Sequence, residues 1–317
     1  MTTNNTKSNS EITNNVDGGA AVSGRPSVYD IITDRIIAQL ENQVIPWHKP
    51  WKGGTTGAPK NLKSGQPYRG INVFLLGMAP FAAPYWLTYR QATERGGSVK
   101  KGEHGYPVVF WKIFERTEKD DNNNERIKRL PCLRYYTLFN VEQCTGIEAP
   151  TTPAVVSDFH PIEKCEAVVA GMPQAPTITH NEGRAYCRPS TDAVSIPRPE
   201  LFSDPAEYYC TLYHELSHAT GHASRLDRPG ITEAHFFGTC DYSKEELIAE
   251  MGAAFLCGHC GIESTTLDNS AAYLSGWLKR LRADSHLIIT AAAQAQRAAD
   301  FILDRKADHT EPATDAA

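Results

Sequence analysis

The 317-residue sequence contains no apolar run near the roughly 20 residues that a membrane-spanning helix requires. Its first residues, MTTNNTKSNSEITNN, lack the apolar core of a signal peptide. The eight cysteines are scattered without the spacing of a disulfide scaffold, so we interpret them as reduced thiols. These absences argue against membrane and small secreted classes, and they predict a cytoplasmic protein with no membrane partner.

The formal net charge of −5 conceals an uneven distribution of charge. Between Val44 and Lys112 the chain has 10 Lys and Arg against 2 Asp and Glu. From Pro150 to Ala317 the counts are 13 and 23. A basic segment inside an acidic protein indicates a separate function for that segment, such as binding a polyanion.

The length is enough for two domains, and the patterning predicts an α+β protein. Residues 28–40 follow a helical apolar period, whereas YPVVFWKIFER and LPCLRYYTLFNVEQC read as antiparallel strands joined by a charged turn. The segment EAPTTPAVVSD is typical of a linker. The predicted divisions are a disordered tail (1–24), a first domain (25–148), a linker (149–160), a second domain (161–306) and a second disordered tail (307–317).

The segment YHELSH carries a histidine, a glutamate and a second histidine at the spacing of a zinc-protease helix. His214 and His218 are one helical turn apart, so both can bind one Zn²⁺ ion. Glu215 would lie beside that ion without binding it, where it can act as a general base on a water molecule. Asp204 and Pro205, at the N-cap and first-turn positions, predict where this helix begins.

Two histidines leave a third metal ligand to be found. His222 follows the glycine expected to end the helix, so we interpret it as a local structural residue, with ligation as the alternative. Glu246 and Glu250, in EELIAEMGAAF, are also one turn apart on a helix that small residues would allow to pack closely. We predict Glu250 as the ligand and Glu246 as a residue that holds a ligand histidine, and the reverse assignment stays open.

The basic front segment interleaves cations with aromatic rings and has 11 aromatic residues up to Lys112. Single-stranded DNA needs cations for its phosphates and flat rings for its bases. The alternative is that the rings form a core, which we expect for Phe74, Phe110 and Trp111 because they stand in apolar runs. The candidate DNA-binding residues are Trp47, His48, Lys49, Trp51, Lys52, Lys60, Lys63, Tyr68, Arg69, Lys100 and Lys101.

Several motifs of the first half resemble the N-terminal domain of the ArdC antirestriction proteins, which also occurs in TraC-type plasmid primases. They are PWHKPW, SGQPYRGINVFLL, WLTYRQA, GGSVKKGEHGYPVVFW and RYYTLFNVEQC. Three segments of the second half are similar to the zincin-like metallopeptidase domain of that family. They are YYCTLYHELSHATGH, the RLDR that follows it, and YSKEELIAEMGAAFLC. The resemblance covers about residues 25–305, and there is no room for the primase catalytic region.

The resemblance implies a plasmid-borne protein that binds single-stranded DNA and protects incoming DNA from host restriction during conjugation. Its C-terminal domain would hold Zn²⁺, and similarity to SprT-like proteases suggests a DNA-bound protein or the host restriction enzyme as a further partner. The alternative is a general metalloprotease whose basic face recruits acidic substrates. TDAVSIP would supply the sheet edge to which an extended peptide adds.

Overall fold

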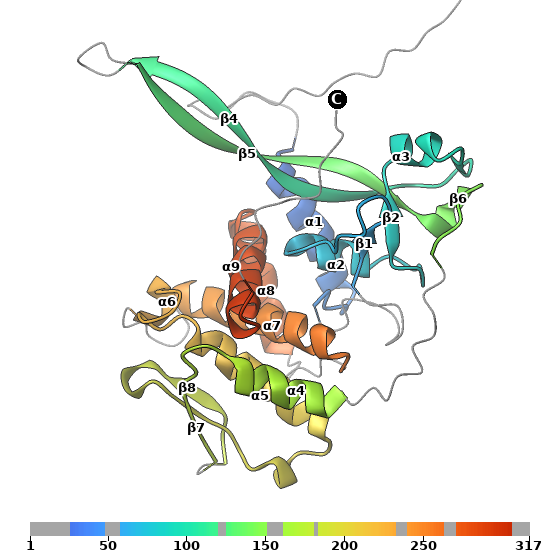
Figure 1. Cartoon of the computed structure of the whole chain (residues 1–317). Helices are drawn as coiled ribbons and strands as arrows, with labels where there is room; N and C mark the ends of the chain where they lie inside the picture. The colour runs from blue at the N-terminus through green and yellow to red at the C-terminus, as the bar shows by residue number, and fades with distance from the viewer. Residues whose placement is uncertain are drawn as a thin grey trace, which may run out of the picture.

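The computed structural model describes residues 26–47, 58–119, 125–150, 161–180, 183–232, 240–262 and 271–305, and its combination of helices with mostly antiparallel strands confirms the α+β class (Figure 1). The front half contains α1 (Val28–Glu41), β1 (Lys60–Asn61), α2 (Ile71–Gly77), β2 (Tyr85–Leu87), α3 (Tyr89–Glu94), β3 (Ser98–Val99), β4 (Tyr106–Lys119), β5 (Glu125–Asn140) and β6 (Cys144–Thr145). The back half contains α4 (Pro161–Gly171), β7 (Thr177–Thr179), β8 (Tyr186–Arg188), β9 (Ala193–Ser195), α5 (Pro205–Ala219), α6 (Pro229–Thr232), α7 (Cys240–Cys260), α8 (Ala271–Ala283) and α9 (Leu287–Ile302). No helix in these ranges is both long and apolar enough to span a lipid bilayer.

Helix α1 begins where the sequence predicts, because Ser27 and Asp30 form a capping box. The Asp30 backbone N–H donates to Ser27 Oγ at 3.2 Å, and the Ser27 backbone N–H donates to the Asp30 carboxylate at 2.9 Å. The apolar face that includes Ile32 and Ile36 is fully buried. The helix therefore forms through both its cap and its apolar stripe.

Strands β4 and β5 form a long antiparallel ribbon that extends beyond the body of the molecule (Figure 1). The pairing runs from Tyr106 opposite Leu138 to Lys119 opposite Glu125. The two strands predicted from the sequence are confirmed, but they continue through most of the segment predicted as a turn. Arg129, in that extension, forms a cross-strand ion pair with Glu115, so the charged composition of the extension reflects exposure rather than a loop.

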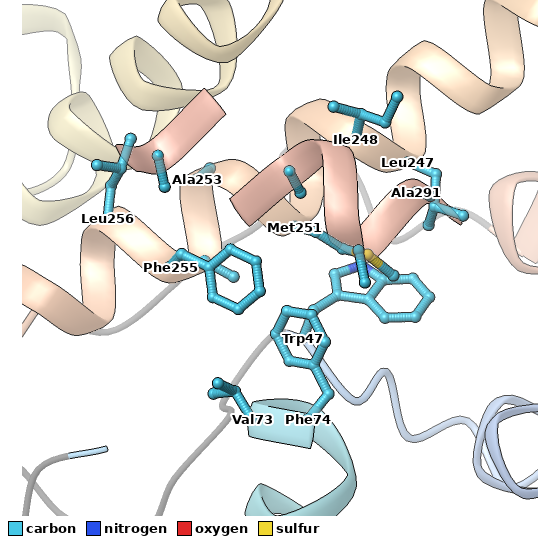
Figure 2. Packing of buried hydrophobic residues seen from close by; sticks show 14 of the residues in the cluster. Trp47, Val73, Phe74, Leu247, Ile248, Met251, Ala253, Phe255, Leu256 and Ala291 are labelled. Carbon is cyan, nitrogen blue, oxygen red and sulfur yellow. The ribbon is translucent and has the colours of Figure 1, made fainter. Parts of the chain in front are cut away.

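Buried side chains of the front half and the back half form one hydrophobic core. Figure 2 shows Trp47 and Phe74 directed towards α7, and the Phe74 ring stacks on Phe255 with centroids 4.8 Å apart. Trp47 also meets Trp277 of α8 edge-on at 5.2 Å. The two segments on either side of the predicted boundary near residue 150 therefore pack directly against each other at this contact.

Polar contacts accompany this packing. Thr33 Oγ1 donates to the Ser285 carbonyl at 2.7 Å, and the Gly70 backbone N–H donates to Gln296 Oε1 at 3.0 Å. The Tyr29 ring stacks on His286 with centroids 3.6 Å apart. Helices α8 and α9 are consequently fixed to the front half.

The small sheet of the back half has the strand order β7-β9-β8. Strands β8 and β9 pair antiparallel, but the prediction that TDAVSIP supplies the edge of the sheet is wrong for Ala193–Ser195. The parallel partner β7 occupies the other side of β9, with Ile178 opposite Val194. A three-residue strand such as β7 shows too little alternation to be recognised from sequence. The free edges of this sheet belong to β7 and β8.

Helices α5 and α7 approach each other closely at Gly252. A Cβ atom placed on Gly252 would lie 2.5 Å from Oγ and 3.0 Å from Cβ of Ser217. Both distances are shorter than normal packing allows, so only glycine fits without movement of a helix. The small residues predicted to permit close packing of this helix serve that purpose.

We expect Gly252→Ala to lower the free energy of unfolding by about 1–3 kcal/mol, because the added methyl group overpacks the α5–α7 contact. The matched control is Gly276→Ala in α8, where an added Cβ meets no atom within 4 Å. That control should stabilise the protein by up to about 1 kcal/mol through helix propensity. Chemical denaturation measures both, and equal effects of the two substitutions would contradict this account of the contact.

Candidate metal centre

Helix α5 places its two histidines through a well-defined N-terminus. The Asp204 side chain accepts a hydrogen bond from the Glu207 backbone N–H at 3.0 Å, and Pro205 occupies the first turn, as predicted. Nine residues after Pro205, His214 and then His218 project from one face of the helix, and both are buried. The start of the helix thus sets the position of the histidine pair.

The Nε2 atoms of the two histidines converge with one carboxylate of α7. His214 Nε2 and His218 Nε2 are 3.1 Å apart. Glu246 Oε2 lies 3.6 Å from the first, and Glu246 Oε1 lies 3.6 Å from the second. These three residues can place one ligand atom each within 4.8 Å of one another.

Two further carboxylates of α7 lie behind the histidine rings. Glu250 Oε1 is 3.9 Å from His214 Nδ1, and Glu245 Oε2 is 4.0 Å from His218 Nδ1. Each ring therefore turns Nε2 inwards and Nδ1 towards a glutamate. A metal-binding histidine commonly donates its other N–H to a carboxylate, which fixes its tautomer and orientation.

Arg228 holds Glu245 in place and completes the C-terminus of α5. Its guanidinium binds both carboxylate oxygens of Glu245, with Nε–Oε1 at 2.9 Å and Nη2–Oε2 at 3.0 Å. It also donates to the Ser217 carbonyl at 2.8 Å and to Thr220 Oγ1 at 2.7 Å. Both ionised side chains are buried, so each compensates for the charge of the other. Sequence reasoning did not identify Arg228 or Glu245, although Arg228 belongs to the RLDR motif.

Glu215 lies beside the histidines and faces strand β8. Burial raises the pKa of its carboxyl group to about 7, while the charge of His214 and a hydrogen bond from the Cys187 backbone N–H act in the opposite direction. A carboxyl group with this pKa can accept and release a proton near neutral pH. Its position and its pKa are both suitable for a general base.

The two histidines differ strongly in proton affinity. Burial lowers the pKa of His214, but its interaction with Glu246 and the charges of Glu250 and Glu215 outweigh burial and raise the pKa to about 9. Burial and the nearby charge of His214 lower the pKa of His218 to about 3. The site therefore favours one positive charge between the two rings.

The donor set fits a divalent metal ion. Two nitrogens bound tetrahedrally to zinc at about 2.0–2.1 Å are about 3.4 Å apart, close to the 3.1 Å between the two Nε2 atoms. Two imidazoles and a carboxylate also form a common catalytic zinc ligand set. In contrast, His222 accepts a hydrogen bond from the Ser224 backbone N–H at 3.2 Å through Nδ1, which suits a local structural residue.

Two of the candidate DNA-binding residues, which were expected at the surface, are buried in the structure. Trp47 is fully buried, and Tyr68 is buried with its hydroxyl oxygen accepting a hydrogen bond from Asn61 Nδ2 at 3.1 Å. Their rings are core residues and have no exposed face for a base, so the prediction is wrong for these two. The reason is that Trp47 packs in the core shared by both halves, whereas Tyr68 packs in a separate hydrophobic cluster of the front half. His48, Lys49, Trp51 and Lys52 lie outside the described residues.

The remaining candidates are cationic side chains that differ in their contacts and in their exposure. Lys60 is half-buried, with its ammonium group 4.8 Å from the Tyr85 ring centroid, and Arg69 forms an ion pair with Asp300. The other three are exposed at the surface, namely Lys63, Lys100 and Lys101.

The three aromatic residues expected in the core also differ from one another. Phe74 is buried as predicted, whereas Phe110 is half-buried. Trp111 is exposed, so the core prediction is wrong for that residue. It lies on the part of the β4–β5 ribbon that leaves the body, where an apolar run does not indicate burial.

Comparison with known protein families matches both halves of the chain. Residues 26–139 match the N-terminal domain of the anti-restriction factor ArdC, and residues 163–294 match a family of zincin-like metallopeptidases. A zincin-like domain implies a bound metal ion, in agreement with the donor set.

Three curated relatives align with most of the chain. Two are proteins called DNA primase TraC from Escherichia coli, 37% identical over 292 residues and 35% identical over 291 residues. Each alignment covers 87% of this chain, which spans only 27% and 20% of the length of those primases. The third is the uncharacterized protein y4eC of Sinorhizobium fredii, 35% identical over 291 residues, with 89% of this chain and 93% of that protein covered.

Two solved structures of the antirestriction protein ArdC from plasmid R388 have the same fold. The metal-free form has a TM-score of 0.70 and 37% identity, and the alignment covers 87% of this chain and 97% of that chain. The Mn(II)-bound form has a TM-score of 0.70 and 36% identity, with 90% and 100% covered.

We expect the affinity of the protein for Zn²⁺ to rise about tenfold per pH unit between about pH 7 and pH 9, because the ion must displace the proton of His214. Below about pH 7 the dependence should steepen, since Glu215 and Glu250 also become protonated there. Titration calorimetry in two buffers of different ionisation enthalpy measures the affinity and the protons released. An affinity that does not change across this range would contradict a proton-occupied histidine pair.

Proposed function

This chain belongs to the family of ArdC antirestriction proteins, and we therefore propose that it binds single-stranded DNA and protects incoming DNA from host restriction during conjugation, with a zinc metallopeptidase centre in its back half. The observation that carries the peptidase part is the convergence of His214, His218 and Glu246 beside Glu215. The DNA-binding part is supported by the match to the ArdC N-terminal domain and by the basic front half.

In this proposal His214, His218 and Glu246 bind the Zn²⁺ ion. Glu246 is favoured over Glu250 because its two oxygens lie near the inward Nε2 atoms, whereas Glu250 lies near the outward Nδ1 atom of His214. Glu250 then orients His214, and Glu245, held by Arg228, orients His218. This arrangement exchanges the roles that the sequence suggested for Glu246 and Glu250.

The catalytic step requires a general base next to the ion. Zn²⁺ bound at such a site supplies Lewis acidity, which allows a water molecule to lose a proton near neutral pH. Glu215 would take that proton as the water attacks a peptide carbonyl, and it would then deliver the proton to the leaving amine nitrogen.

Strand β8 is the favoured contact for an extended peptide. Cys187 of β8 directs its backbone N–H to Glu215, so this strand runs next to the general base. β8 is also an edge of the small sheet, and an edge strand can bind a peptide through main-chain hydrogen bonds. A protein bound to the same DNA is a suitable substrate class, because the shared core fixes the DNA-binding half relative to the metal centre.

We expect His214→Ala and His218→Ala to abolish stoichiometric Zn²⁺ binding, and Glu246→Ala to weaken it more than Glu250→Ala. Loss of a residue that only orients a ligand costs about 10- to 100-fold in metal affinity. Metal analysis of the purified variants, together with competition against a chelator, measures the order. If Glu250→Ala removes the ion and Glu246→Ala retains it, the assignment of the two glutamates is reversed.

We expect Glu215→Gln to retain Zn²⁺, the fold and DNA affinity while lowering peptide hydrolysis by about 10²- to 10⁴-fold, the usual contribution of a general base. The same variant should still protect transferred DNA if protection results from coating the strand. Conjugation efficiency into a restricting host, relative to a non-restricting host, measures protection. Loss of protection at normal DNA affinity would show that hydrolysis, rather than coating, is the active function.

A further inference from the structure

The outer part of the β4–β5 ribbon carries several cations on one side, which the charge counts along the sequence did not reveal. We define the outer ribbon as residues 109–117 of β4 and 127–135 of β5, which pair with each other beyond Val108 and its partner Tyr136. This region projects from the body of the molecule (Figure 1). Most of its cations lie after Lys112 in the sequence and therefore outside the segment counted as basic.

The strand register divides the outer ribbon into two different faces, because residues directly opposite each other project on the same side. One face, which we call the basic face, is formed by Phe110 and Arg134, Lys112 and Cys132, Phe114 and Leu130, and Arg116 and Lys128. The other face, which we call the apolar face, is formed by Val109 and Tyr135, Trp111 and Leu133, Ile113 and Pro131, Glu115 and Arg129, and Thr117 and Ile127.

The charges of the outer ribbon are concentrated on the basic face. On the apolar face Arg129 is neutralised by Glu115, with Nε–Oε1 at 3.1 Å. The residues of the basic face named above include four cations and no acid; the next pair outward, Arg126 and Glu118, is of opposite charge. These pairs therefore place four cations, from both strands, on one side of the ribbon.

Arg116 and Lys128 are both exposed and lie directly opposite each other in the register. Both side chains are therefore accessible from the same side of the ribbon, where neighbouring phosphates of one strand can contact both.

Phe114 holds two of the cations side by side. The Lys112 ammonium lies 5.4 Å and the Arg134 guanidinium 5.5 Å from the centroid of its ring. Such cation–π contacts restrict the two long side chains before any partner binds. A partner with regularly spaced negative charges therefore meets a partly ordered row of cations, which reduces the entropy lost on binding.

Exposed rings on the apolar face favour a single strand as the partner. Trp111 is 42% exposed and Tyr135 is 37% exposed, and the register makes them diagonal neighbours. On the same face, Ile113 is 62% exposed, and Ile127, opposite Thr117 farther out on the ribbon, is 67% exposed. A flexible single strand can follow the cations with its phosphates and pass around the narrow ribbon to stack bases on these rings, whereas a duplex is stiff and keeps its bases stacked internally.

We propose that the outer ribbon is the surface that binds single-stranded DNA, with its basic face contacting the phosphates and Trp111 and Tyr135 stacking on bases. The proposal rests on the proposed function, since it names the surface through which the chain would bind DNA. An acidic protein would be attracted to the same cations but would gain nothing specific from the exposed rings.

The test uses the full-length protein and a fluorescent oligothymidylate of about 20 nucleotides, with affinity measured as a function of salt concentration. Substituting Lys112→Gln together with Arg116→Gln should remove two phosphate contacts. The slope of log affinity against log salt should fall by about 1.4, and the affinity at about 0.1 M salt should fall roughly 25-fold. Trp111→Ala should weaken binding roughly tenfold without changing the slope.

Two matched variants separate charge from structure. Lys279→Gln with Arg297→Gln makes the same change of charge on exposed positions of α8 and α9, and it should leave the affinity within about twofold. Lys112→Arg with Arg116→Lys keeps the ribbon charge and should bind like the unmodified protein. Zn²⁺ stoichiometry and thermal unfolding, measured for each variant, confirm that the fold is intact.

Retention of wild-type affinity and slope by the Lys112→Gln, Arg116→Gln variant would overturn the ribbon proposal while leaving DNA binding by the chain intact. Equal affinity of the unmodified protein for single strand and duplex, with equal loss in the variant, would overturn the stacking part. If the unmodified protein does not bind single-stranded DNA, the proposed function itself fails.

Discussion

The metal centre depends on the close contact between α5 and α7 at Gly252. Both histidines come from α5, whereas Glu245, Glu246 and Glu250, whose carboxylates lie within 4.0 Å of the ring nitrogens, come from α7. The distance between the two helices is set where Ser217, one residue before His218, faces Gly252. A larger residue there would separate the nitrogens from the carboxylates as well as loosen the core. The same contact therefore determines both the stability of this pair of helices and the geometry of the site.

Helix α7 also connects the centre to the rest of the molecule. Its face away from α5 packs in the same core as α9, and Phe255 stacks on Phe74 of the front half (Figure 2). A ligand-bearing helix that is held on several sides has little freedom to rotate, which keeps Glu245, Glu246 and Glu250 in place. The front half thus supports the helix that carries the carboxylates of the metal centre. Because the two halves share this core, the sequence boundary near residue 150 does not separate two independently packed units.

The sequence was sufficient to predict the parts of the site that depend on local spacing. The cap at Asp204, the helix of His214 and His218 and the helix of Glu246 and Glu250 follow from short-range patterns. The i, i+4 spacing places both glutamates on one face, but the rotation of α7 about its axis decides which of them meets Nε2, and tertiary packing sets that rotation. Arg228 and Glu245 were missed for the same reason, because their pairing joins residues 17 positions apart, one before α6 and the other on α7.

The contrast between Trp47 and Trp111 shows what composition cannot determine. Both tryptophans stand near cations in the sequence, yet one is buried between the halves and the other is exposed on the ribbon. Charge favours the ribbon over the back half as the proposed DNA-binding surface. The back half has 23 Asp and Glu against 13 Lys and Arg, so it repels phosphates over about a Debye length, roughly 8–10 Å. A basic ribbon that projects from the body holds its cations away from that acidic surface (Figure 1). A strand bound there avoids the repulsion, while the core contacts at the base of the ribbon still fix its direction relative to the metal centre.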